Sequence, residues 1–156
     1  MHRRNALLVA TLISGVVARG AVHAAEQKIT RAQLPPAVEK TVATESRGAT
    51  ITGFSTETER GQKLYEVELV VDGHGRNIQI DARGEIVEVE EEVPLASLSA
   101  AVQAGLKQRA GAGLIGRVES LTKRGTLVAY EAVVRNGKKR SEIQVGPDGT
   151  RLAHPE

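Results

Sequence analysis

Carboxylates are the residues of this sequence with the clearest chemical potential, and they are densest in one short segment. That segment holds Glu85, Glu88, Glu90, Glu91 and Glu92. Alternate residues of a strand share a face, so Glu88, Glu90 and Glu92 would point the same way. A cation site needs oxygens that converge from a shaped loop, which makes a metal site at these three the weaker interpretation. The favoured one is a charged strand edge that discourages sheet-to-sheet aggregation.

No catalytic constellation accompanies these carboxylates. The chain has no cysteine, which excludes a thiol nucleophile, a zinc-thiolate site and c-type haem attachment. Beyond residue 24 the only histidines are His74 and His154, which have no second ligand near them in the sequence. No metalloprotease, serine-hydrolase or phosphate-loop motif is present. We therefore expect no enzyme, no catalytic residue and no cofactor.

A second set of polar residues recurs at matching places in the two halves of the chain. Glu66 and Gln79 of the first half correspond to Glu131 and Gln144 of the second, at an offset of 65 residues. Residues of this kind on alternating strand positions would occupy the solvent side of a sheet. They are either ordinary solvated positions or a face that binds a partner. The candidate partner-binding set is Glu66, Glu68, Gln79, Glu131, Arg135 and Gln144.

Charge is distributed unevenly along the chain. Residues 26–92 carry 14 acidic and 8 basic side chains, whereas residues 93–156 carry 5 and 10. A candidate basic turn, Lys138, Lys139 and Arg140, lies where the first half has Gly73-His74-Gly75. The two halves either complement each other where they meet or form a polarised surface that steers a charged protein partner.

The first residues predict a secretory signal peptide over residues 1–24. Arg3 and Arg4 precede an apolar stretch, residues 6–18, which is shorter than the roughly 20 residues that span a membrane. Small residues follow, with cleavage after Ala24 or at Ala25. The general secretory route is favoured, and the paired arginines leave twin-arginine export open. We expect a periplasmic or secreted protein with no stable membrane anchor after cleavage.

Removal of this leader changes the electrostatic character of the chain. Residues 1–24 hold three of the 21 lysines and arginines and no acidic residue, so the net charge falls from +2 to −1. A nucleic-acid partner is therefore not expected, because such proteins need a basic surface.

The elements that must position these residues follow from hydrophobic periodicity. Leu34, Val38 and Val42 recur at helical spacing, and Leu98, Val102 and Leu106 repeat the pattern. Period-two alternation then predicts strands, which in the first half are residues 49–57, 65–71, 76–81 and 85–90. Gly53 interrupts the first of these, which indicates a bulge. The expected fold class is α+β, with two tandem repeats that each pack a helix on a roughly four-stranded antiparallel sheet.

The order of these motifs resembles the PepSY or PepSY-like domain. The first copy reads Leu34-Pro-Pro-Ala-Val38, Tyr65-Glu-Val67, Asp72-Gly73 and Ile78-Gln-Ile-Asp-Ala-Arg-Gly-Glu-Ile86. The second keeps Tyr130-Glu131, Asn136-Gly137 and Ile143-Gln-Val-Gly-Pro-Asp-Gly149, but lacks the prolines at the helix start. The resemblance implies a beta-lactamase-inhibitor-like arrangement and a non-catalytic role. Such domains occur in protease propeptides, where inhibition is the proposed function.

These observations together predict three segments: the signal peptide 1–24, a first repeat over 30–92 and a second over 93–156. The expected function is an exported, non-enzymatic binding module that inhibits or modulates another extracytoplasmic protein, such as a peptidase. The alternative is a small-ligand or cation-responsive envelope protein, resting on Glu88, Glu90 and Glu92.

Overall fold

The computed structural model describes residues 26–156. The expected signal peptide, residues 1–24, and the cleavage positions Ala24 and Ala25 lie outside the described residues.

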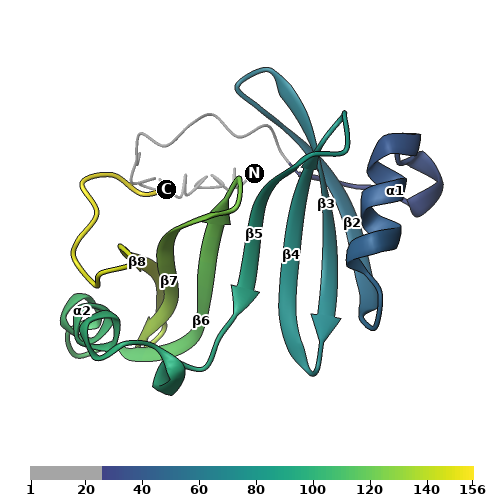
Figure 1. The fold of residues 1–156 in the computed structure, drawn as a ribbon. Coiled ribbons are helices and arrows are strands. Elements are labelled where there is room, and N and C mark those ends of the chain that lie inside the picture. The colour runs from purple at the N-terminus through teal and green to yellow at the C-terminus, as the bar shows by residue number, and fades with distance from the viewer. Residues whose placement is uncertain (1–25) are drawn as a thin grey trace, which may run out of the picture.

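Eight strands and two α-helices make up the described chain (Figure 1). The helices are α1 (Pro36–Glu45) and α2 (Ala100–Ala110), each preceded by a short 3-10 turn, Arg31–Gln33 and Leu95–Ser97. The strands are β1 (Gln27–Lys28), β2 (Thr50–Glu59), β3 (Gln62–Val71), β4 (His74–Asp81), β5 (Ile86–Glu92), β6 (Leu114–Lys123), β7 (Thr126–Asn136) and β8 (Lys139–Val145). All eight form one antiparallel sheet in chain order, from β1 to β8.

The expected pair of tandem repeats, each with its own roughly four-stranded sheet, is wrong. β5 pairs with β6 from Glu88 opposite Lys123 to Glu92 opposite Glu119, so the sheet continues across the expected boundary at residues 92 and 93. The backbone N–H of Val93 extends this pairing by donating to the carbonyl of Val118. The second half adds only β6, β7 and β8, and beyond β8 a single bridge joins Val145 to Arg151.

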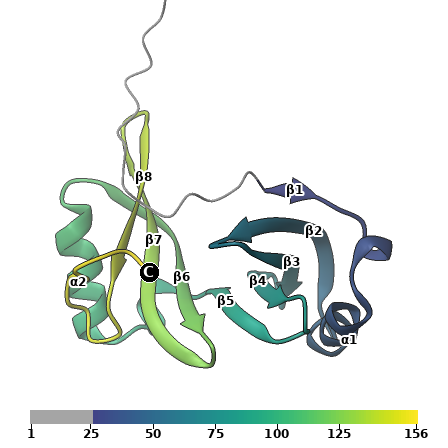
Figure 2. The ribbon, with the colours of Figure 1, turned by 90° about the horizontal axis from the view of Figure 1, so that it is seen from above.

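The two helices lie on the same face of this sheet, which follows from the strand register. Val38 and Val42 of α1 pack on inward residues of β3 and β4, such as Val67 and Ile78. Ile78 lies opposite Val89 of β5, and the same face continues into β6. There Val102 and Leu106 of α2 pack on the residues Val118, Ala132 and Val145. The opposite face carries no helix, and the curvature of the sheet makes it concave (Figure 2).

Irregular pairing contributes to this curvature. The register of β2 against β3 shifts between Ile51 and Gly53, which confirms the bulge expected at Gly53. Further shifts occur where β4 pairs with β5, between Gln79 and Ile80, and where β6 pairs with β7, between Ile115 and Val118 and between Leu121 and Thr122. Bulges bend the strand that carries them and increase its twist, so they help to close the sheet around its helix-free face.

Two glycines allow the turns that follow β4 and β8 to lie close against the helices. Gly84 has φ +85° and Gly149 has φ +80°, which is the left-handed region that glycine adopts without strain. A methyl group on Gly84 would lie 2.6 Å from the carbonyl oxygen of Ala37 in α1. At Gly149 it would collide with the backbone of Ala101 in α2. These turns can approach the helix backbone only because they have no side chain.

We predict that Gly84→Ala destabilises the protein more than Gly61→Ala. Gly61 has φ +81°, but a methyl group there would meet nothing within 4 Å. Both variants lose about 1–2 kcal/mol from the left-handed backbone, and only Gly84→Ala adds a steric cost of about 1–3 kcal/mol. Urea denaturation measures the difference. Equal losses in the two variants would contradict the close approach of this turn to α1.

Candidate functional site

The helix-free concave face carries three rows of side chains that run across the sheet from strand to strand. Residues directly opposite each other on neighbouring strands share a face, so the register defines each row. The first row is Ser55, Glu66, Gln79, Glu88 and Lys123. The second is Glu68, Asn77, Glu90, Leu121 and Ala129. The third is Glu92, Glu119, Glu131 and Gln144.

Five of these residues, which we call the carboxylate cluster, are Glu66, Glu88, Glu90, Glu119 and Glu131. They come from four strands, β3, β5, β6 and β7, and therefore from both halves of the chain. Glu66, Glu88 and Glu90 line one hollow of about 140 Å³ together with Asn77 and Gln79. The cluster is thus a product of the continuous sheet rather than of either half.

Burial and mutual repulsion disfavour the charged form of these carboxyl groups. The pKa of Glu90 rises from its usual value of 4.5 to about 7, because the group is desolvated and because Glu119, Glu88, Glu131 and Glu66 repel its charge. Desolvation is also the largest cause that raises the pKa of Glu66, Glu88 and Glu119. Burial always disfavours an ionised carboxylate, and a like charge nearby adds to the effect.

The carboxylates have few cationic partners among the described residues. Lys123 approaches Glu88 at 3.7 Å, and Arg117 approaches Glu119 at 3.4 Å. Both distances exceed the range of a short charge-assisted hydrogen bond. No ion pair within residues 26–156 reaches Glu66, Glu90 or Glu131.

Neutral donors satisfy part of the hydrogen-bonding capacity of the face. The Ser55 hydroxyl donates to Glu66 at 3.2 Å, and the Gln144 amide donates to Glu131 at 2.7 Å. Gln79 donates to Glu57 at 2.7 Å. These bonds orient carboxylates and amides without neutralising charge, so the face keeps a negative character.

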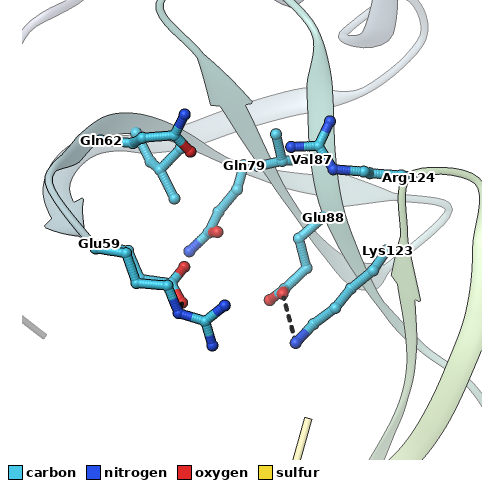
Figure 3. Close-up of a pocket in the computed structure, with 9 residues that line it drawn as sticks. Glu59, Gln62, Gln79, Val87, Glu88, Lys123 and Arg124 are labelled. Carbon is cyan, nitrogen blue, oxygen red and sulfur yellow. Dashed lines mark ion pairs between the residues drawn. The ribbon is translucent and has the colours of Figure 1, made fainter. Parts of the chain in front are cut away.

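A larger hollow of about 360 Å³ adjoins the cluster at the ends of β2, β5 and β6. Figure 3 shows Glu88 and Lys123 joined by their ion pair, with Gln79 beside them and Arg124 at the rim. Its lining mixes both signs of charge with apolar surface, namely Glu59, Arg60, Gln62, Leu64, Gln79, Val87, Glu88, Lys123 and Arg124. Lys123 also lies 3.8 Å from Glu156 of the C-terminal segment. This hollow gives the otherwise acidic face a basic rim.

The structure brings most of the sequence-predicted partner-binding residues together. Glu66, Glu68, Gln79, Glu131 and Gln144 all lie on the concave face. Their side chains are half-buried rather than fully solvated.

Arg135 is separated from the rest of that set. It lies near the end of β7, opposite Arg140 of β8. It therefore belongs with the predicted basic turn, Lys138, Lys139 and Arg140, which occupies the exposed end of the β7–β8 hairpin.

The interpretation of the acidic segment as a strand edge is wrong. β5 is a central strand that pairs with β4 on one side and β6 on the other, so it has no free edge to protect. Glu88, Glu90 and Glu92 do share a face, as expected, and Glu92 accepts a hydrogen bond from the backbone N–H of Gly75 at 3.2 Å. Within residues 26–156, however, no group of three or more acidic or histidine side chains could hold a metal ion.

Sequence reasoning missed Glu119, the residue with the largest electrostatic effect on Glu90. Its position in an alternating strand was visible as Val118-Glu119-Ser120-Leu121. The signal that was lacking is the pairing of β5 with β6, which places Glu119 directly opposite Glu92. Pairing of charges across this junction is mixed, because Glu88 faces Lys123 whereas Glu92 faces another carboxylate.

Comparisons with known proteins relate this fold to solved structures. No protein-family model and no curated protein sequence matches the chain. A DUF2874 family protein from Bacteroides ovatus matches with a TM-score of 0.61 at 16% identity, over 77% of this chain and 85% of its own. A BLIP-like protein from Bacteroides fragilis matches with a TM-score of 0.57 at 19% identity, over 76% and 83%.

A third structure, from Bacteroides eggerthii and described as periplasmic, matches with a TM-score of 0.64 at 16% identity, over 76% and 86%. Likeness at this level of identity establishes a shared fold. The chain therefore has a BLIP-like fold, which is the arrangement that the sequence resemblance implied. Among residues 26–156, neither helix has the length and apolar character that crossing a membrane requires.

We predict that Glu90→Gln stabilises the protein at alkaline pH. The folded pKa of Glu90, about 7, lies above its usual 4.5, so the folded state holds an extra proton between these values. The resulting stability is fully present below pH 4.5 and is lost as the pH rises through 7. At pH 8 the neutral amide should therefore raise the free energy of unfolding by about 1–2 kcal/mol.

Glu91→Gln is the matched control, because Glu91 is exposed and lies next to Glu90 on the other face of β5. It should change stability by less than about 0.5 kcal/mol. Thermal or urea unfolding at pH 5 and pH 8 measures both variants. Stability of Glu90→Gln that parallels the wild type across this pH range would contradict the desolvation of Glu90.

Proposed function

We propose that the chain is a non-enzymatic, exported binding module that acts in the periplasm and holds a protein partner on its concave face. The partner is another extracytoplasmic protein, and by extension a peptidase that the module inhibits. The observation that carries the proposal is the carboxylate cluster, which gathers five acidic side chains on a helix-free sheet face where, among the described residues, only Lys123 and Arg117 pair with them.

Electrostatic complementarity favours a partner with lysine or arginine side chains. A desolvated carboxylate without a counter-charge is costly, and one that gains a paired cation recovers much of that cost. Complementary charge also steers encounter and selects among partners. The half-buried cluster can therefore recognise a basic segment whose charged side chains reach into the hollows of the face.

Two parts of the proposal, export to the periplasm and kinship with PepSY domains, have separate support. The expected signal peptide over residues 1–24 and the periplasmic description of a structural neighbour both favour the periplasm. The PepSY-like motifs, such as Leu34-Pro-Pro-Ala-Val38 and Tyr65-Glu-Val67, favour an inhibitory role. Kinship with PepSY domains is part of this proposal and depends on those motifs alone.

We predict that neutralising the concave face removes partner capture. A face variant, Glu66→Gln/Glu90→Gln/Glu131→Gln, keeps side-chain shape while making three carboxyl positions neutral at every pH. The immobilised wild-type protein should retain a reproducible protein from the exported fraction of its own host, released by raised salt. The face variant should retain it at least about tenfold less, equivalent to about 1.4 kcal/mol. Quantitative mass spectrometry of the eluates measures the ratio.

The matched control variant is Glu39→Gln/Glu85→Gln/Glu91→Gln, which removes the same charge at positions outside the concave face. It should retain the partner as the wild type does. Recovery of no reproducible protein, or equal recovery by the face variant, would contradict the proposal. If the captured partner is a peptidase, addition of the wild-type protein should lower its peptidase activity. Unchanged peptidase activity would contradict the inhibitory part of the proposal.

A further inference from the structure

The β7–β8 hairpin forms a second surface whose chemistry is the opposite of the concave face. Every residue from 135 to 142 is exposed, and the end of the hairpin extends beyond the other described elements (Figure 2). It carries four cations, Arg135, Lys138, Lys139 and Arg140. Only Arg140 has an ion pair among the described residues, with Glu142 at 3.3 Å.

An exposed apolar residue adjoins these cations. Leu114 begins β6 opposite Arg135, and its exposed fraction of 76% makes it the only large hydrophobic residue so exposed within residues 26–156. Aliphatic surface beside cations is suited to protein contact, because burial of the leucine adds an apolar gain to the pairing of charges.

We propose that the β7–β8 hairpin of one copy docks on the concave face of a second copy of this chain. The inference rests on the proposed function in taking the concave face as a binding surface, but it requires no foreign partner. The two surfaces are complementary in charge, with four cations on the hairpin and five carboxylates in the cluster.

The dimensions of the two surfaces agree. The carboxylate cluster extends from β3 to β7, which is four strand spacings or about 19 Å along the sheet. A two-stranded ribbon is one strand spacing wide, about 5 Å between backbones, and its side chains bring it to roughly 10 Å. The hairpin is therefore narrower than the cluster and can lie on it beside the C-terminal segment, with its lysines directed at Glu90 and the carboxylates around it.

The presence of the basic hairpin and the acidic face on the same chain has a functional consequence. Docked copies cover each other's binding face, so a foreign basic segment must displace the hairpin before it binds. Self-association then sets a threshold for partner binding that depends on protein concentration and ionic strength.

Sedimentation velocity of the protein purified from the exported fraction tests this inference. At about 20 mM salt the average mass should rise towards twice the monomer value or more with concentration, and at about 500 mM salt this rise should be lost. A hairpin variant, Lys138→Glu/Lys139→Glu, should stay monomeric. The control Lys40→Glu/Lys107→Glu changes the same charge on the exposed sides of α1 and α2, and should associate as the wild type does.

Mixing two defective variants gives the decisive result. The hairpin variant keeps an intact face, and the face variant of the preceding section keeps an intact hairpin. Neither should self-associate, and their mixture should form a one-to-one complex, which also demonstrates that both variants are folded. A wild type that stays monomeric in low salt, or a mixture that stays monomeric, would overturn the inference. Partner capture by a monomeric wild type would still support the proposed function, so the two failures are distinguishable.

Discussion

The antiparallel pairing of β5 with β6 is the constraint on which the rest of the structure depends. It runs from Glu88 opposite Lys123 to Glu92 opposite Glu119 and joins the two halves into one sheet. Because both helices lie on one side of that sheet, the other side carries no helix within residues 26–156, and the end of the chain reaches it where Glu156 contacts Gln144 and Lys123. The concave face, its hollows and the carboxylate cluster exist only while this pairing is made.

The acidic composition of the concave face gives it an electrostatic cost. Polar and acidic side chains on an open sheet are ordinary when water reaches them, but here curvature and neighbours such as Leu121 withdraw them partly from water. Desolvation therefore dominates the pKa shifts of Glu66, Glu88, Glu90 and Glu119. The fold tolerates this cost on a face where complementary charge can offset it, which is the arrangement expected of a binding surface rather than of a stabilising core.

Local patterns were sufficient to predict most elements and much of the site. The stripe of Val38 and Val42, the alternation from Tyr65 to Val71 and the bulge at Gly53 all depend on residues close in sequence. The shared face of Glu66 and Gln79 also follows from alternation and a short hairpin.

The pairing of the two halves depends on contacts that no local pattern contains. An acidic strand such as β5 looks the same in the sequence whether it ends a sheet or lies in its centre, so the edge interpretation failed there. Its partner β6 is separated from it by α2, so the register that brings Glu119 beside Glu90 depends on pairing between segments that are not adjacent in the sequence. Alternation places Arg135 on the same side of β7 as Glu131, and its distance along the long β7–β8 hairpin separates it from the cluster.

The most direct test of this account is the titration of the Glu90 carboxyl carbon, followed by NMR on selectively labelled protein. Glu90 lies in the first half of the chain, whereas Glu119 and Glu131, which raise its pKa, lie in the second. One continuous sheet with a desolvated concave face predicts a pKa of about 7 for Glu90. A pKa close to the usual 4.5 would contradict the account, because the concave face would then not withdraw Glu90 from water and bring the other carboxylates near it.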